Sequence, residues 1–182
     1  MKKQILILSV LCFSFFSATS QYVENFDLTE SEFKSTYKFD SISTYHQETN
    51  YILKDTVYGI SDEWVYQFED NKLQHSIFGH YTDEIDEINF KKNLKAAQNL
   101  IIDFTEIYGK PLDLEIGDTS FVDPYDQRHW GYDVIEARWL TNGMKIKIEF
   151  DFFGGKGEYH FIFSVKYFDK DYPYFDWFLP LS

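Results

Sequence analysis

The chain has 182 residues, with 17 basic and 30 acidic side chains and a net charge of -13. This balance argues against a nucleic-acid-binding protein, because neutralising phosphates requires clustered Lys and Arg. A hydrophobic fraction of 44%, with 20% aromatic residues, excludes a disordered chain and fits one domain that buries a core.

The first twenty residues have the organisation of a secretory signal peptide. A short basic start is followed by a mostly apolar run over residues 5–16, and Ala18 and Ser20 occupy the small-residue positions of a cleavage site. We therefore expect cleavage after Ser20, a secreted or periplasmic location, and no membrane span in the mature chain. The only cysteine, Cys12, lies inside this segment. The alternatives are an uncleaved anchor and a lipid attached to Cys12.

Short elements are predicted at the start of the mature chain. Thr29 and Glu32 have capping-box spacing, which indicates a short helix over residues 30–36. Residues 40–50 are polar and rich in turn formers, which favours a loop or a weak strand. The β-branched and aromatic residues from Tyr51 to Ile60 indicate a strand.

A β-hairpin is predicted over residues 63–80. Apolar and polar residues alternate from Trp64, a polar turn follows at residues 70–72, and the alternation resumes at Leu73. Period-two patterning on both sides of a turn is typical of paired antiparallel strands.

One long amphipathic helix is predicted at about residues 83–108. Six apolar residues recur at alternating spacings of four and three, which places them on one stripe. The six are Phe90, Leu94, Ala97, Ile101, Phe104 and Tyr108. Leu100 and Ile107 are expected to widen this stripe, and Gly109 followed by Pro111 is expected to end the helix.

A three-stranded antiparallel meander is predicted over residues 132–168. Asn142-Gly143 suits a tight turn, and the glycine-rich residues 154–157 suit a second one. Between these turns, apolar residues alternate strictly with charged ones from Met144 to Phe152. One face of the meander is apolar and should meet the core, and the mixed face should meet water or a partner.

Together these elements predict an α+β fold in which the antiparallel sheet of the hairpin and the meander packs against the long helix. The expected organisation is a signal peptide at residues 1–20, a single domain at 21–168 and an aromatic C-terminal tail at 169–182. Prolines in the tail argue against a helix interior or a central strand. Its rings either dock on the domain or belong to a mobile segment.

The long loop predicted over residues 112–131, with a short strand at 112–116, carries the candidate ligand-binding residues. It combines basic groups with rings that can stack on sugars or anchor proteins. The candidate residues are Tyr125, Arg128, His129, Trp130 and Tyr132. We expect the partner to be a protein or a carbohydrate.

No motif in the chain indicates catalysis, a cofactor or a metal. The sequence has no G-x-S-x-G or H-E-x-x-H pattern, and the mature chain has no thiol. Asp113, Glu115 and Asp118 match a calcium loop in composition but not in spacing, so a solvated acidic loop is the expected interpretation.

The leading hypothesis is therefore an exported, non-catalytic binding or interaction module of the bacterial envelope or the extracellular space. One alternative is a small secreted hydrolase or lyase in which His129 acts as a base beside Asp126, with Glu136 or Arg138 as a further group. Another is a purely structural component of the envelope.

Overall fold

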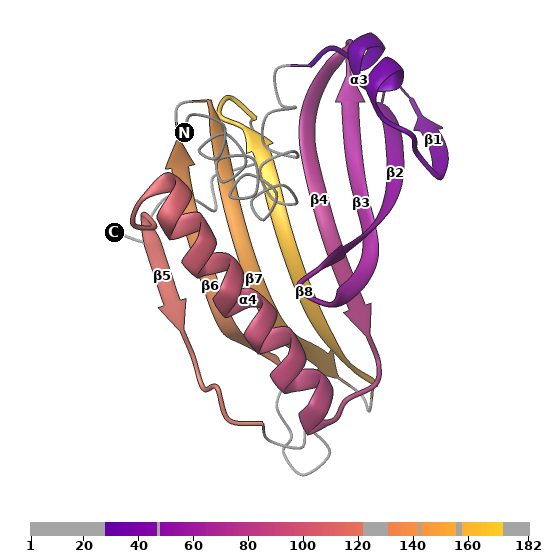
Figure 1. Cartoon of the computed structure of the whole chain (residues 1–182). Helices are drawn as coiled ribbons and strands as arrows, with labels where there is room; N and C mark the ends of the chain where they lie inside the picture. The colour runs from indigo at the N-terminus through magenta and orange to yellow at the C-terminus, as the bar shows by residue number, and fades with distance from the viewer. Residues whose placement is uncertain (1–27, 47, 122–130, 142, 156–157, 173–182) are drawn as a thin grey trace, which may run out of the picture.

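A computed structural model of the chain describes residues 28–46, 48–121, 131–141, 143–155 and 158–172. These residues form one eight-stranded antiparallel sheet and two helices (Figure 1). The helices are α3 (Glu30–Thr36) and α4 (Glu87–Tyr108). The strands are β1 (Ser41–Tyr45), β2 (Glu48–Val57), β3 (Ile60–Glu69), β4 (Lys72–Thr82), β5 (Asp113–Ile116), β6 (Gly131–Thr141), β7 (Met144–Gly155) and β8 (Glu158–Asp169). The predicted α+β class with an antiparallel sheet is confirmed.

Two antiparallel meanders, joined side by side, make up the sheet. The strand order is β1-β2-β3-β4-β8-β7-β6-β5, so β4 pairs with β8, and β1 and β5 are the two edges. The predicted hairpin corresponds to β3 and β4, and the predicted meander corresponds to β6, β7 and β8. Gly59 and Gly143 occupy turns with positive φ angles of 81° and 125°, where a side chain would be strained.

The stretch from residue 40 to residue 60 differs from its prediction. The polar residues 40–50 contain β1 and the beginning of β2, so the weak-strand alternative is correct. The strand predicted from Tyr51 to Ile60 is interrupted, because β2 ends at Val57 and Ile60 already begins β3. All of β2 pairs with β3, and these backbone hydrogen bonds hold the strand in place. The polar composition of residues 48–50 therefore did not indicate a strand that depends on pairing.

Both ends of α4 are defined by specific contacts. The side chain of the N-cap residue Asp86 accepts a hydrogen bond from the Asn89 N–H at 2.7 Å, so the helix begins after the acidic stretch that was included in the prediction. At the other end, Gly109 has a φ of 82°. Its carbonyl accepts a hydrogen bond from the Trp139 indole on β6 at 2.9 Å, which ties the end of α4 to the sheet.

The buried face of α4 is rotated relative to the predicted stripe. Leu94, Ile101 and Tyr108 are only partly buried, and Ile107 is exposed. The buried residues are Phe90, Asn93, Ala96, Ala97, Leu100 and Phe104.

The curl of the sheet explains this rotation. Figure 1 shows the β2–β3 turn reaching toward α4, and there the Tyr58 hydroxyl donates a hydrogen bond to the Asp103 carboxylate. The flank of α4 that faces the β2–β3 turn is therefore covered, whereas the opposite flank faces the short edge strand β5. Helical periodicity identifies a stripe but not how far a curved sheet wraps around it.

Aromatic rings fill the core. The predicted capping box of α3 is present, with the Thr29 N–H donating to Glu32 Oε2 at 2.9 Å and the Glu32 N–H donating to Thr29 Oγ1 at 3.3 Å. Phe33, the one buried residue of α3, packs on rings of β2 and β3. These rings belong to Tyr51, Tyr66 and Phe68.

No helix in the described part of the chain is long and apolar enough to cross a membrane.

Candidate functional site

Six ionisable side chains gather on the face of the sheet that points away from α4. They belong to β6, β7 and β8, where they alternate with buried core residues such as Ala137, Ile148 and Val165. We call this group the charged face. Its members are Glu136, Arg138, Lys147, Glu149, Asp151 and Lys166.

The strand register places like charges directly opposite one another. Glu136 on β6 is the cross-strand partner of Glu149 on β7, and Arg138 is the partner of Lys147. Lys147 in turn lies opposite Lys166 on β8. Because directly opposed like charges destabilise a sheet, the stabilising contacts of this face must involve other neighbours.

Lys147 joins two carboxylates. Its Nζ lies 2.7 Å from Glu136 Oε2 and 2.5 Å from Glu149 Oε2. Arg138 forms a further ion pair with Glu136 and reaches Asp113 on β5 at 3.4 Å. Since Glu136 is only 7% exposed, its charge depends on these two cations rather than on water.

Glu149 is the most enclosed charge of the face, at 4% exposed. It forms an ion pair with Lys166 and accepts a hydrogen bond from Ser164 Oγ at 2.7 Å. Burial alone would raise the pKa of Glu149, but the ammonium groups of Lys166 and Lys147 outweigh burial and lower this pKa to about 2. Burial also opposes the charge on Lys147, yet Glu149 and Glu136 raise the pKa of this amine. Both groups are therefore ionised at neutral pH.

Asp151 lies in the opposite kind of environment. Burial, together with the carboxylates of Glu149 and Asp133, raises the pKa of Asp151 to about 7. Asp133 is its direct cross-strand partner on β6. The Oδ1 atom of Asp151 is enclosed and accepts no hydrogen bond from the described residues. This carboxyl group therefore changes its charge near neutral pH.

Aromatic rings lie on the same face beside Asp151. Tyr81 on β4 stacks on the imidazole of His160 on β8, with 4.4 Å between the ring centroids. Phe153 on β7 is the cross-strand partner of His160, and Tyr81 and Phe153 are 57% and 61% exposed. The face thus combines fixed charges with rings on which a planar or apolar group can stack.

The residues predicted from the sequence are only partly covered by the structure. Glu136 and Arg138, named for the enzyme alternative, belong to the charged face and pair with each other. Tyr132 belongs to β6. The remaining predicted residues lie outside the described part of the chain: Tyr125, Asp126, Arg128, His129 and Trp130.

Four members of the charged face were missing from the predicted site. They are Lys147, Glu149, Asp151 and Lys166. The signal that could have found the first three is the alternation along β7, which already assigned them to the mixed face. Lys166 joins them only through the pairing of β7 with β8.

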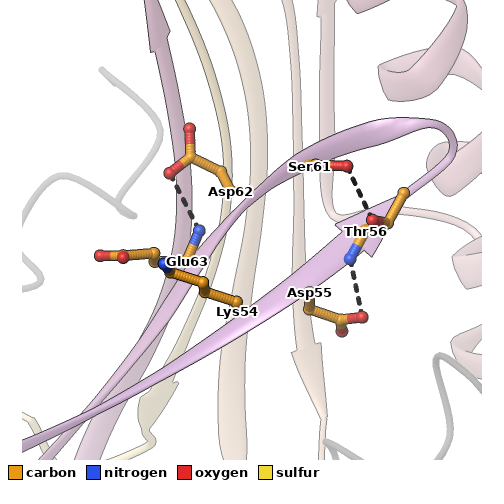
Figure 2. Close-up of a pocket in the computed structure, with 6 residues that line it drawn as sticks. All are labelled: Lys54, Asp55, Thr56, Ser61, Asp62 and Glu63. Carbon is orange, nitrogen blue, oxygen red and sulfur yellow. Dashed lines mark hydrogen bonds between the residues drawn. The ribbon is translucent and has the colours of Figure 1, made fainter. Parts of the chain in front are cut away.

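A second polar site lies at the β2–β3 hairpin (Figure 2). It is a shallow pocket of about 420 Å³, lined by Lys54, Asp55, Thr56, Ser61, Asp62 and Glu63. One lining residue contacts a histidine outside the lining, because His80 Nδ1 on β4 lies 2.8 Å from Asp62 Oδ2. A carboxylate in this position orients an imidazole ring and leaves its other nitrogen available for proton transfer.

The hydroxyl groups of this pocket are not presented to the imidazole of His80. Ser61 follows the strand alternation and projects from the opposite side of the hairpin to Asp62 (Figure 2). Its Oγ shares a hydrogen bond of 2.8 Å with Thr56 Oγ1. The hairpin therefore offers an oriented base without a hydroxyl nucleophile in front of it.

Within the part of the chain that the structure describes, no group of three or more His, Cys, Asp or Glu side chains is placed to hold a metal ion. Comparisons of the chain with protein-family models, with curated proteins and with solved structures give no match. Within the described residues, the charged face and the hairpin pocket are candidates for the functional site.

Proposed function

We propose that the chain is an exported, non-catalytic binding module that holds its partner, a protein or a carbohydrate, on the charged face. The observation that carries the proposal is the enclosure of Glu136 and Glu149, at 7% and 4% exposed, in an ion-pair network opposite α4. The signal-peptide pattern of residues 1–20 supports export.

Stability alone is a weak reason to keep such a network. Removing a charge from water costs several kcal/mol, and apolar side chains of similar volume often stabilise a protein as well or better. An ion-pair network does increase the specificity of a recognition surface, because a fixed pattern of charges rejects partners whose charges do not match. Here the basic row of Arg138, Lys147 and Lys166 runs across three strands beside the acidic row of Glu136 and Glu149.

The exposed rings beside Asp151 define the ligand classes to test. Tyr81 and Phe153 can stack on a sugar ring while the neighbouring carboxylates accept hydrogen bonds from its hydroxyl groups. The same rings can anchor a protein, since aromatic residues often dominate the free energy of protein association. Oligosaccharides and peptides are therefore the two arms of the experiment.

The proposal is tested on arrays of oligosaccharides and peptides, using the wild-type chain and two variants with the same change in charge. Lys166→Met removes a cation from the charged face. Lys91→Met removes one from the exposed surface of α4, where Lys91 pairs with Glu87 at 2.6 Å. We expect Lys166→Met to lose array binding by about tenfold or more, and Lys91→Met to bind as the wild type does.

Near-ultraviolet circular dichroism checks that both variants keep their tertiary packing. If the two folded variants bind equally, the ligand is held elsewhere on the molecule and the charged face is not the binding site.

The alternative is a small secreted hydrolase or lyase, and the observation that favours it is the pair of His80 and Asp62 at the hairpin pocket. A panel of chromogenic esters and glycosides separates the two functions. Turnover that falls about a hundredfold in His80→Gln supports an enzyme with His80 as its base. Turnover that is absent, or unchanged in this variant, excludes His80 from that role.

A further inference from the structure

The edge strand β5 has an apolar side that is open to solvent. Its residues Leu114 and Ile116 are 46% and 61% exposed, and Leu112 just before it is 61% exposed. The other edge, β1, carries one exposed apolar residue, Ile42 at 51% exposed, beside the polar and exposed residues Ser43 and Thr44. Natural sheets usually defend their edges with charges or prolines, so the apolar side of β5 stands out.

The backbone of β5 is oriented for pairing on its free side. The Gly117 N–H, just after the strand, donates to the Val134 carbonyl of β6 at 3.0 Å. Because the backbone groups of a strand alternate in direction, those of Glu115 face β6 as well, whereas those of Leu114 and Ile116 face away from the sheet. Among the residues that the structure describes, none pairs with these two N–H and two carbonyl groups on the outer side of β5.

Glycine is required at position 117 to hold this arrangement. A Cβ atom added at Gly117 would lie 2.4 Å from the Asp133 carbonyl oxygen, well inside van der Waals contact. The close approach fixes the end of β5 against the irregular pairing at Asp133 and Val134. The free edge is thus presented by a rigidly attached strand.

The two faces of β5 carry different side chains, one apolar and the other acidic. Leu114 lies opposite Ala137 on the side of the sheet that faces α4. Asp113 and Glu115 lie on the side of the charged face, where Asp113 reaches Arg138 at 3.4 Å. Glu115 has another carboxylate, that of Glu136, as its cross-strand partner.

We propose that β5 is the docking edge for an extended segment of another protein in which basic residues alternate with apolar ones. The apolar residues of that segment cover Leu114 and Ile116, and its basic residues face Asp113 and Glu115. The added strand pairs with the outward backbone groups of β5 and extends the sheet. This edge is a surface beyond the ligand site proposed on the charged face.

Charge complementarity disfavours a second copy of the chain as the occupant. A symmetric antiparallel pairing centred on Leu114 or on Glu115 places Glu115 opposite Asp113 or Glu115 of the other copy, whereas a pairing centred on Ile116 places it opposite Gly117. Two of these three registers oppose carboxylates, and the two chains each carry a net charge of -13. A basic segment turns the same contacts into attractions.

A synthetic peptide of alternating Lys and Val is the probe, and a peptide of the same composition with its Lys and Val in two blocks is the control. Binding to the full chain is measured by isothermal titration calorimetry, and amide hydrogen exchange locates the site. We expect the alternating peptide to bind about tenfold more tightly than the block peptide, and to protect the amides of Leu114 and Ile116.

Two variants test the geometry. Leu114→Pro removes an outward N–H without removing a bond to β6, so it should weaken the alternating peptide by about tenfold. Glu115→Lys should weaken the Lys-Val peptide and strengthen a Glu-Val peptide, whereas Glu106→Lys on α4, with the same change in net charge, should change neither preference.

Three outcomes would overturn the inference. The first is equal binding of the alternating and block peptides. The second is unchanged peptide binding in a Leu114→Pro variant that is folded by circular dichroism. The third is a concentration-dependent dimer, seen by sedimentation velocity, that Leu114→Pro abolishes, since this result assigns the edge to a second copy.

Discussion

Replacing Lys147 with Met tests whether ion pairs between opposite charges stabilise the charged face. In one of them, Lys147 contacts Glu136 rather than Arg138, its direct cross-strand partner. The change removes the ammonium group that lies 2.7 Å from Glu136 and 2.5 Å from Glu149 and keeps most of the apolar volume of the side chain. Two carboxylates that are direct cross-strand partners then face each other, and each belongs to a residue less than 10% exposed. The variant should be less stable at neutral pH.

The size of the effect follows from the register. Facing side chains place the two carboxylates on the order of 6 Å apart. At an effective dielectric constant of about 20, charges at that distance repel by about 3 kcal/mol. Arg138 still pairs with Glu136, and Lys166 still pairs with Glu149, so these contacts offset part of the repulsion. We expect the free energy of unfolding to fall by about 2 kcal/mol.

Urea unfolding at neutral and acidic pH measures this loss, with Lys91→Met as the control. Lys91 forms an exposed pair within α4, so its removal should cost less than about 0.5 kcal/mol. Lys147 is one of the two cations that lower the pKa of Glu149 from 4.5 to about 2, so the loss in Lys147→Met should be complete at neutral pH and should shrink as the pH falls through this range. Equal losses in the two variants, or a loss that does not depend on pH, would mean that Lys147 does not stabilise the facing carboxylates.

Three further changes probe other parts of the molecule. Phe33→Ala removes the single buried anchor of α3 and should cost about 3–5 kcal/mol in urea unfolding, whereas a cost below about 1 kcal/mol would mean that α3 does not help to close the core. The raised pKa of Asp151 means that the folded chain binds this proton more tightly than the unfolded chain, so the group makes stability fall as the pH rises from about 4 to about 7. Asp151→Asn should therefore be more stable than the wild type at about pH 8 and not at about pH 4, and a pH-independent difference would exclude the assigned titration. Gly117→Ala should cost about 1–3 kcal/mol and speed amide exchange in β5, because its Cβ meets the Asp133 carbonyl; unchanged exchange in β5 would show that the close approach is not needed.

Local patterns predicted most of the elements. The alternation from Met144 to Phe152 identified β7, and the spacing of Thr29 and Glu32 identified the start of α3. Each of these signals depends on residues close together in the chain. Residues 40–50 gave no such signal, because an edge strand held by backbone pairing does not need apolar alternation.

The charged face depends on long-range pairing and could be predicted only in part. The alternation placed Lys147, Glu149 and Asp151 on one side of β7, but their relation to Glu136 and Lys166 follows from the register of β6, β7 and β8. The rotation of α4 has a similar origin, because it depends on how far the β2–β3 turn curls toward the helix. A sequence pattern assigns faces, and only the register determines which groups meet.

If the charges of this face are retained for recognition rather than for stability, one triple variant should separate the two properties. Glu136→Leu, Lys147→Met and Glu149→Leu together replace the centre of the network with apolar side chains of similar size. We expect its free energy of unfolding to lie within about 1 kcal/mol of the wild-type value or above it, and its array binding to be lost. A variant that loses several kcal/mol of stability, or one that still binds the array ligands, would contradict this expectation.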